Sequence, residues 1–379
     1  MNNGSRSILT TIIVIAISIA LVSIPVYAGS VDDRIENEGL EREIIKYAEN
    51  WLTDNYDEFY NIRNLQSSLI DIDDCKETVD YTIALSCETN YKITKVEDIP
   101  LIKGVIYYVE NNDLSLEPER AINEFIDNIK TDAFSEEWVG LNVNVVVRIS
   151  KSNNSLSWEL LYDDGLTNEL RDVDELALNY DDLYNLGYKT AEEIVSGGLP
   201  EAQGTDTYNK TLARNYSRQY TSNPSTCDVH GYSCGTLQNR AYWNTSQYPN
   251  FSVFNDNDCA DFVSQALSRG GIPEVTGSSG WYRTKYASSG TPWSINWTVV
   301  SYLTSYMTSH SYFTSTTYAN CLAGEVMTTN YGGHVVMVDY NDGTTHRFNG
   351  HTNDRYQYAF SNYAGSAYYK VHRWEYPVS

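Results

Sequence analysis

The first half of the chain shows the hydrophobic period of helices in two places. Apolar residues recur every three or four positions over residues 40–59, and this spacing predicts a long amphipathic helix. A second helix is predicted from about 117 to 129, with Pro118 in its first turn, where proline is favoured.

Between and after these helices, the pattern changes to alternation of apolar and polar residues. This period of two predicts strands at 79–85, 105–109 and 141–149. Residues 156–162 are the expected hairpin partner of the third strand. Helices packed on an antiparallel sheet would make residues 29–175 a separate α+β domain. This domain contains no histidine, and we assign it no chemistry.

Glycine and proline then mark a linker over residues 176–206, which includes Gly197, Gly198 and Pro200. Acidic residues become sparse beyond the linker, and Tyr, Ser, Thr and Asn become frequent. Residues 207–379 are therefore expected to form a second domain.

The first 28 residues have the features of an export signal. Arg6 precedes an apolar run over 8–24, and Val26-Tyr27-Ala28 has the small-x-small pattern that signal peptidases cleave. The run is at the lower limit of length for a membrane span, and no basic stop-transfer cluster follows it. We therefore favour cleavage over a retained N-terminal membrane anchor, and expect a secreted protein, extracellular or in the cell wall.

The charge is distributed unevenly. Residues 206–379 carry 11 Lys and Arg and 11 Asp and Glu, so the net charge of −24 lies almost wholly in residues 29–205. An acidic surface repels phosphate polymers, which argues against nucleic acid as a partner.

Six cysteines occur, at positions 75, 87, 227, 234, 259 and 321. In an exported protein the simplest pairing is local, with disulfides joining Cys75 to Cys87 and Cys227 to Cys234. This pairing leaves Cys259 and Cys321 free. The alternative is a disulfide between these two, which would leave Cys259 unable to act as a nucleophile.

Residues 254–271 predict a helix that begins with a cysteine. Asp258 can act as the N-cap, and Gly270-Gly271 can end the helix. One helix face collects the apolar residues Phe262, Val263, Ala266 and Leu267. Free amides and the helix dipole at the first turn favour a thiolate, so Cys259 is the candidate nucleophile.

A histidine stands at the head of an apolar, strand-like run further along the chain, in Tyr331-Gly-Gly-His334-Val-Val-Met-Val. His334 would be the general base that takes the thiol proton and later returns it to the leaving amine. Helix starts and strand heads both place polar groups at element ends, where clefts form.

A third group should orient the imidazole. Residues 334–340 and 345–351 predict a hairpin, and a four-residue loop would place His351 opposite His334, with Asn349 one step diagonal. A three-residue turn with a glycine bulge would instead place Gly350 opposite. The spacing leaves both registers open.

Several motifs together resemble the putative amidase domain of exported bacterial proteins. They are Tyr208-Asn-Lys, Asp258-Cys259-Ala-Asp-Phe262-Val-Ser264-Gln265, Gly333-His334-Val-Val and His351-Thr-Asn-Asp354-Arg. This family is similar to the papain-like hydrolases of the NlpC/P60 and CHAP type, and the resemblance covers about residues 206–376. It implies a papain-like C-terminal domain with His351 as the third catalytic member, and Asn349 stays in reserve. Asp261 replaces the family's usual asparagine and adds a negative charge near the thiol.

Neither of two metal-like patterns is complete. Cys227-x-x-His230-x-x-x-Cys234 lacks a fourth zinc ligand, and residues 255–258 begin a calcium-like loop that lacks the required glycine and closing glutamate. We expect no metal and no cofactor.

These features predict an exported, cysteine-dependent amide hydrolase that works through an acyl-enzyme. The Cys259 amide, with a donor such as Tyr248 or Asn250, would stabilise the oxyanion. The family context implies a peptide or peptidoglycan substrate and is compatible with association with the cell surface. The alternative is a non-catalytic cell-surface binding or scaffold protein that retains the domain, which Asp261 and a bridge between the last two cysteines would favour.

Overall fold

The structure is a computed structural model that describes residues 31–75, 77–152, 155–166, 169–196, 205–224, 237–248, 257–283, 293–362 and 364–375. Contacts divide the chain into residues 1–42 and residues 43–379, and the description below concerns the second unit. No helix within the described ranges is long and apolar enough to cross a membrane. The expected export signal, residues 1–28, lies outside them.

The α-helices are α1 (Val31–Tyr56), α2 (Pro100–Glu110), α3 (Leu116–Phe134), α4 (Tyr180–Ser196), α5 (Lys210–Gln219), α6 (Cys259–Arg269), α7 (Ile295–Thr298) and α8 (Val300–Ser309). The 3-10 helices are η1 (Val96–Asp98), η2 (Val173–Leu176), η3 (Arg240–Tyr242) and η4 (Asn330–Gly332). The strands of the first half are β1 (Tyr60–Asp74), β2 (Thr78–Tyr91), β3 (Val139–Ser152), β4 (Ser155–Asp163) and β5 (Leu170–Asp172). Those of the second half are β6 (Thr205–Asp206), β7 (Phe313–Thr316), β8 (Val326–Thr329), β9 (His334–Asn341), β10 (His346–Gly350), β11 (Arg355–Phe360), β12 (Ala367–Val371) and β13 (Trp374–Glu375).

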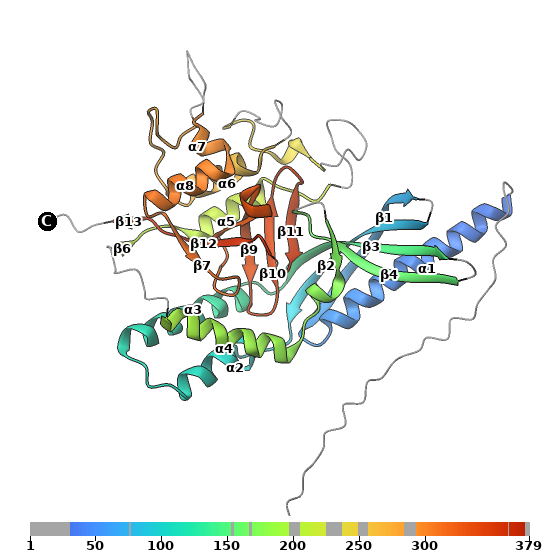
Figure 1. The fold of residues 1–379 in the computed structure, drawn as a ribbon, viewed down its shortest axis with the longest axis horizontal. Coiled ribbons are helices and arrows are strands. Elements are labelled where there is room, and N and C mark those ends of the chain that lie inside the picture. The colour runs from blue at the N-terminus through green and yellow to red at the C-terminus, as the bar shows by residue number, and fades with distance from the viewer. Residues whose placement is uncertain are drawn as a thin grey trace, which may run out of the picture. The chain divides into compact units, whose positions relative to one another are not determined.

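One large sheet joins strands from both halves of the chain (Figure 1). Its main path runs β1-β2-β3-β11-β10-β9-β8-β12-β7, with β4 and β5 attached through β3. β3 and β11 pair in parallel at Asn142 and Tyr358, and the other pairings of this sheet are antiparallel. Helices and a mainly antiparallel sheet confirm the α+β class.

Most elements predicted in the first half are present. α1, α3, β2 and the β3–β4 hairpin lie where the periods placed them. α1 packs on the sheet, because the ring of Tyr47 meets Trp158 edge-on at 5.8 Å and Ser67 donates a hydrogen bond to Glu49 at 2.6 Å.

The strand predicted at 105–109 is wrong, since these residues belong to α2. Pro100 begins the helix, and Leu101, Ile102 and Val105 are buried along one side of it. Proline fits the first helical position because its fixed φ matches the helix and no amide is needed there. A short apolar run does not distinguish a strand from a buried helix by itself.

The expected linker contains a packed helix. α4 lies against α2, and the two helices meet at a glycine on each side. A Cβ at Gly187 would lie 1.8 Å from the Leu101 carbonyl oxygen, and one at Gly104 would lie 2.0 Å from the Tyr184 carbonyl oxygen. The missing side chains therefore allow the two backbones to touch.

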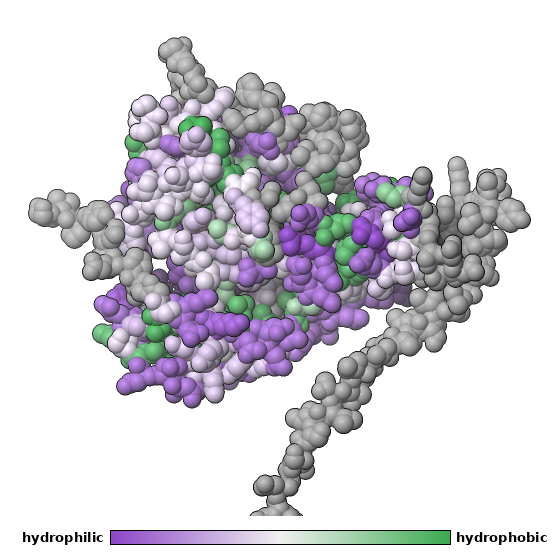
Figure 2. Space-filling view, in the orientation of Figure 1, coloured by the Kyte–Doolittle hydropathy of each residue, from purple (hydrophilic) through white to green (hydrophobic). Residues whose placement is uncertain are grey.

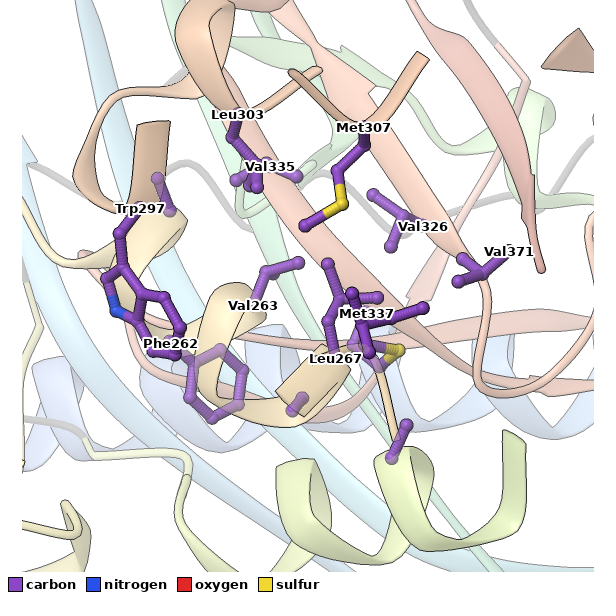
Figure 3. Packing of buried hydrophobic residues seen from close by; sticks show 14 of the residues in the cluster. Phe262, Val263, Leu267, Trp297, Leu303, Met307, Val326, Val335, Met337 and Val371 are labelled. Atoms are coloured by element: carbon purple, nitrogen blue, oxygen red, sulfur yellow. The ribbon is translucent and has the colours of Figure 1, made fainter. Parts of the chain in front are cut away.

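One face of the sheet in the second half is covered by α5, α6 and α8. The residues in contact there include Val263 and Leu267 of α6, Leu303 and Met307 of α8, Val326 of β8, Val335 and Met337 of β9 and Val371 of β12 (Figure 3). This buried layer holds the start of α6 against β9.

The opposite face of the same strands has a separate apolar cluster. Val336 and Val338 of β9 pack there with Phe348 and Phe360. Because successive side chains of a strand point to opposite faces, neighbouring residues of β9 alternate between the two clusters.

Ion pairs connect the front part of the chain to the back part. Arg218 on α5 binds Asp339 of β9 at 2.6 Å and Glu136, next to α3, at 2.6 Å. Arg214, one turn earlier on α5, lies 3.6 Å from Asp132 of α3. Hydrophilic residues gather over α2, α3 and α4 in Figure 2, in keeping with the acidic charge of the first half.

The predicted Cys75–Cys87 disulfide is wrong, because both thiols are free. Cys75 follows the end of β1, where Asp74 pairs with Val79, whereas Cys87 lies eight residues further along β2. At about 3.3 Å per residue the two are about 26 Å apart, far beyond the ~7 Å that a disulfide can span between Cα atoms. Cys227 and Cys234 lie outside the described residues.

Candidate active site

The first turn of α6 forms the centre of the candidate site. Asp258 occupies the N-cap position, and its carbonyl accepts the Phe262 amide at 2.9 Å. Its carboxylate makes no capping hydrogen bond, contrary to the expectation, because it is turned toward His351. Every residue from Cys259 to Leu267 is buried, so the cysteine begins a helix that is enclosed on all sides.

Cys259 is 6% exposed, and its thiol contacts the Val335 amide near the head of β9. Burial raises the pKa of Cys259 to about 11, and the Asp258 charge also raises it. The Val335 amide, the Thr352 hydroxyl and the Ala260 amide lower this pKa but do not offset burial. The expected thiolate is therefore not favoured in this structure, since desolvation outweighs the first-turn amides.

The alternative disulfide to Cys321 is not formed, and both thiols are free. Cys321 packs in the cluster with Val336, on the other face of the sheet from Cys259. Its thiol donates to the Val326 carbonyl at 3.7 Å.

His334 opens β9 and pairs with Thr329 of β8. Since Val335 faces α6, alternation places the His334 side chain on the opposite face, with Val336. Burial lowers the pKa of His334 to about 4, with nearby Asp164 opposing that shift. Its Nε2 is buried and has no hydrogen-bond partner among the described residues. The ring is thus neutral, with Nε2 open within the described part of the chain, and the amide of the next residue, Val335, contacts the Cys259 sulfur.

The β9–β10 hairpin adopts neither predicted register. Asn341 pairs with His346 across a loop of residues 342–345, and a register shift after Arg347 then pairs Asn349 with Met337. His351 is therefore not directly opposite His334. The Asp342 carboxylate holds this loop: it accepts hydrogen bonds from the Thr344 and Thr345 amides at 2.9 and 2.8 Å, and from Tyr60, in the front half of the chain, at 2.6 Å.

Asn349 lies in a structural network instead of beside His334. Its amide donates to Asp339 at 2.7 Å and to Ser217 at 2.9 Å, and its carbonyl accepts the Gln357 amide at 2.8 Å. These contacts tie β10 to α5 and β11.

His351 contacts the first turn of α6 directly. Its Nδ1 lies 2.8 Å from the Asp258 carboxylate, and its Nε2 lies 2.6 Å from the Tyr220 carbonyl. The ring stacks on Phe262 at 3.9 Å and on Trp243 at 4.5 Å. Burial lowers the pKa of His351 and raises that of Asp258 to about 7, so the pair is most stable with one shared proton and no net charge.

Residues 351–355 arrange the surroundings of the site. After His351, Thr352 accepts the Asp258 amide at 3.0 Å, and the Asn353 side chain accepts the Leu237 amide at 2.8 Å. The Asp354 carboxylate accepts the Trp243 indole at 2.8 Å, and Arg355 binds Asp163 at 3.0 Å. One short motif therefore contacts α6, the segment before it and the front half of the chain.

Asp261, the acidic residue two positions after Cys259, has several partners of its own. Its carboxylate pairs with Arg283 and accepts hydrogen bonds from Trp297 and Gln265. Burial raises the pKa of Asp261 to about 7, and Asp258 adds to the rise. Within the described ranges, no group of three or more His, Cys, Asp or Glu could hold a metal ion.

Of the two side chains expected to donate a hydrogen bond to the oxyanion, Tyr248 lies near the C-terminal end of α6, away from Cys259. Its hydroxyl contacts Ser268, nine residues beyond Cys259, which is about 13 Å along a helix. Asn250 lies outside the described residues. Thr352, which contacts both Asp258 and the sulfur, was missed, although it adjoins His351 in the motif that was singled out.

The fold and site define a mixed α+β protein with a buried cysteine at the start of a helix. This helix packs on an antiparallel sheet, and the aspartate before the cysteine is hydrogen-bonded to a histidine. Residues 207–374 match the family model described as "Putative amidase domain". The resemblance seen in the motifs is confirmed over these residues. No curated protein and no solved structure matches the chain.

Proposed function

We propose that residues 207–374 form a cysteine-dependent amide hydrolase in which Cys259 is the nucleophile. The observation that carries this proposal is the position of the sulfur, with the Val335 amide, the Ala260 amide and the Thr352 hydroxyl all lowering its pKa. These donors stabilise negative charge at one atom, which a purely structural cysteine does not need.

His334 is our candidate for the proton acceptor. Its Nε2 has no hydrogen-bond partner in the described part of the chain and its ring is neutral, as a general base requires. Because the ring lies on the far face of β9 in this structure, the reaction requires it to turn toward the sulfur at the strand head. His351 is the third member of the catalytic group, and it acts through Asp258, to which it is hydrogen-bonded.

In this scheme the sulfur attacks the amide carbonyl and its proton passes to His334. The C–N bond then breaks, the proton goes to the leaving amine, and water releases the acyl group from sulfur. We further propose an exported protein whose substrate is peptidoglycan or an extracellular peptide. The sequence features of residues 1–28 and the family context support this part.

A non-catalytic binding or scaffold role is the second candidate. It is favoured by the burial of the thiol and by its raised pKa, since the thiolate is the reactive form.

The test is release of free amines from peptidoglycan and from a peptide panel by the full chain. Cys259→Ala should abolish release, whereas Cys321→Ala, which removes another buried free cysteine, should retain it. His334→Ala should reduce release strongly, with His346→Ala as the buried-histidine control. Release by Cys259→Ala at the native rate would exclude this mechanism. If the native protein binds peptidoglycan without releasing amines, the scaffold role is supported instead.

A further inference from the structure

Thr352 has a backbone conformation that its residue type avoids. Its φ is 84°, in the left-handed region, where a β-branched residue is a genuine outlier. Such strain costs about 1–3 kcal/mol and persists only where surrounding contacts enforce it. Strain of this kind is concentrated at functional sites.

The contacts that enforce this conformation come from both sides of the residue. His351 is hydrogen-bonded to Asp258, and the Asn353 side chain accepts a hydrogen bond from the Leu237 amide. The Thr352 carbonyl accepts a hydrogen bond from Gln238 at 3.1 Å. Thr352 is thus fixed between the start of α6 and the segment at 237–239.

The strained backbone directs the hydroxyl toward the nucleophile. Oγ1 accepts the Asp258 amide at 3.0 Å, and the hydroxyl also contacts the Cys259 sulfur, where it lowers the thiol pKa. A hydroxyl has one proton to donate and two lone pairs. With a lone pair occupied by the amide, its proton is free to point at the sulfur.

We propose that Thr352 is a positioning residue for Cys259: its hydroxyl, held by the Asp258 amide, donates a hydrogen bond that stabilises the thiolate. Thr352 acts on the thiol pKa through a side-chain hydrogen bond, whereas Val335 and Ala260 act through backbone hydrogen bonds. This inference deepens the proposed function and rests on it for its catalytic meaning, but the hydrogen bond can be tested without a substrate.

The experiment compares Thr352→Val, which removes the hydroxyl and keeps the branched shape, with Thr352→Ser, which keeps the hydroxyl. Iodoacetamide labelling of the full chain is followed by mass spectrometry of the Cys259 peptide between pH 8 and 10. The exposed thiol of Cys75 is the internal reference. Unfolding midpoints check that each variant is folded.

We expect Thr352→Val to slow labelling of Cys259 about tenfold at each pH, because losing a hydrogen bond to a charged group raises the thiol pKa by about one unit. Thr352→Ser should keep the native rate, and labelling of Cys75 should not change. Equal rates for native protein and Thr352→Val would overturn the assignment, as would equal slowing by both variants.

The two proposals can fail separately. If Cys259→Ala still releases amines, the hydrolase mechanism fails, while the labelling rates still decide the role of Thr352. If the labelling rates do not depend on the hydroxyl, the Thr352 assignment fails, while Cys259 can still be the nucleophile. In the hydrolysis assay, Thr352→Val should lower the rate and shift its pH profile upward, and Thr352→Ser should restore both.

Discussion

Replacing Asp258 by asparagine should stabilise the protein at alkaline pH. The Asp258 carboxyl is 3% exposed, and burial raises its pKa from 3.8 to about 7. Asparagine has nearly the same shape, and its amide can donate to His351 Nδ1 in place of the protonated carboxyl. The variant therefore keeps the pair and removes only the buried charge.

The magnitude follows from this pKa shift. Because the folded protein holds the Asp258 proton more tightly than the unfolded chain, folding takes up a proton between about pH 4 and about pH 7. Stability due to this group is thus complete below about pH 4 and is lost as the pH rises to about 7. A shift of about three pH units corresponds to ~4 kcal/mol at 1.36 kcal/mol per unit.

The assay is urea unfolding of both proteins from pH 4 to pH 8.5. Asp258→Asn should match the native protein near pH 4 and exceed it increasingly up to about pH 7, with a constant difference above that. Asp71→Asn, at an exposed position of β1, controls for the general loss of one negative charge. If Asp258→Asn is less stable than the native protein at pH 8, the pair is an ion pair of carboxylate and imidazolium, and the reasoning is refuted.

Two further predictions concern packing. Leu267→Ala removes a fully buried side chain between α6 and β9 and should lower the free energy of unfolding by ~2–5 kcal/mol, measured by urea unfolding. Leu212→Ala, at a leucine that is 53% exposed, should change it by less than ~0.5 kcal/mol; equal losses would contradict the burial of α6. Gly187→Ala should destabilise by ~1–3 kcal/mol, despite the better helix propensity of alanine, because its Cβ would meet the Leu101 carbonyl. Gly39→Ala, in α1 with nothing within 4 Å, should instead stabilise by up to ~1 kcal/mol, and a stabilising Gly187→Ala would show that α2 and α4 do not touch there.

Much of the secondary structure could be predicted because the spacing of apolar residues along a segment reflects which of its side chains are buried. The β3–β4 hairpin, α3 and the start of α6 follow from alternation, from Pro118 and from the Asp258–Gly271 boundaries. The error at 105–109 arose because a short apolar run suits a strand and a buried helix equally. β1, with its long exposed edge, has too few buried positions for its period to be recognised.

The site itself depended on contacts between distant segments. The sequence alone determined that Cys259 begins a helix, because the apolar positions and the ending glycines are local. It did not determine the protonation of the thiol, since burial in the folded protein raises its pKa, and Val335 and Thr352, whose hydrogen bonds lower it, are distant in the chain.

Only the tertiary structure decided which face of the sheet each histidine occupies. Side chains on a strand alternate, so a register shift of one residue moves a side chain to the other face. In the loop at 342–345, Asp342 accepts hydrogen bonds from the Thr344 and Thr345 amides and from Tyr60, nearly three hundred residues away in sequence. The contact of His351 with Asp258 joins residues 93 positions apart, so no pattern within the hairpin could predict it.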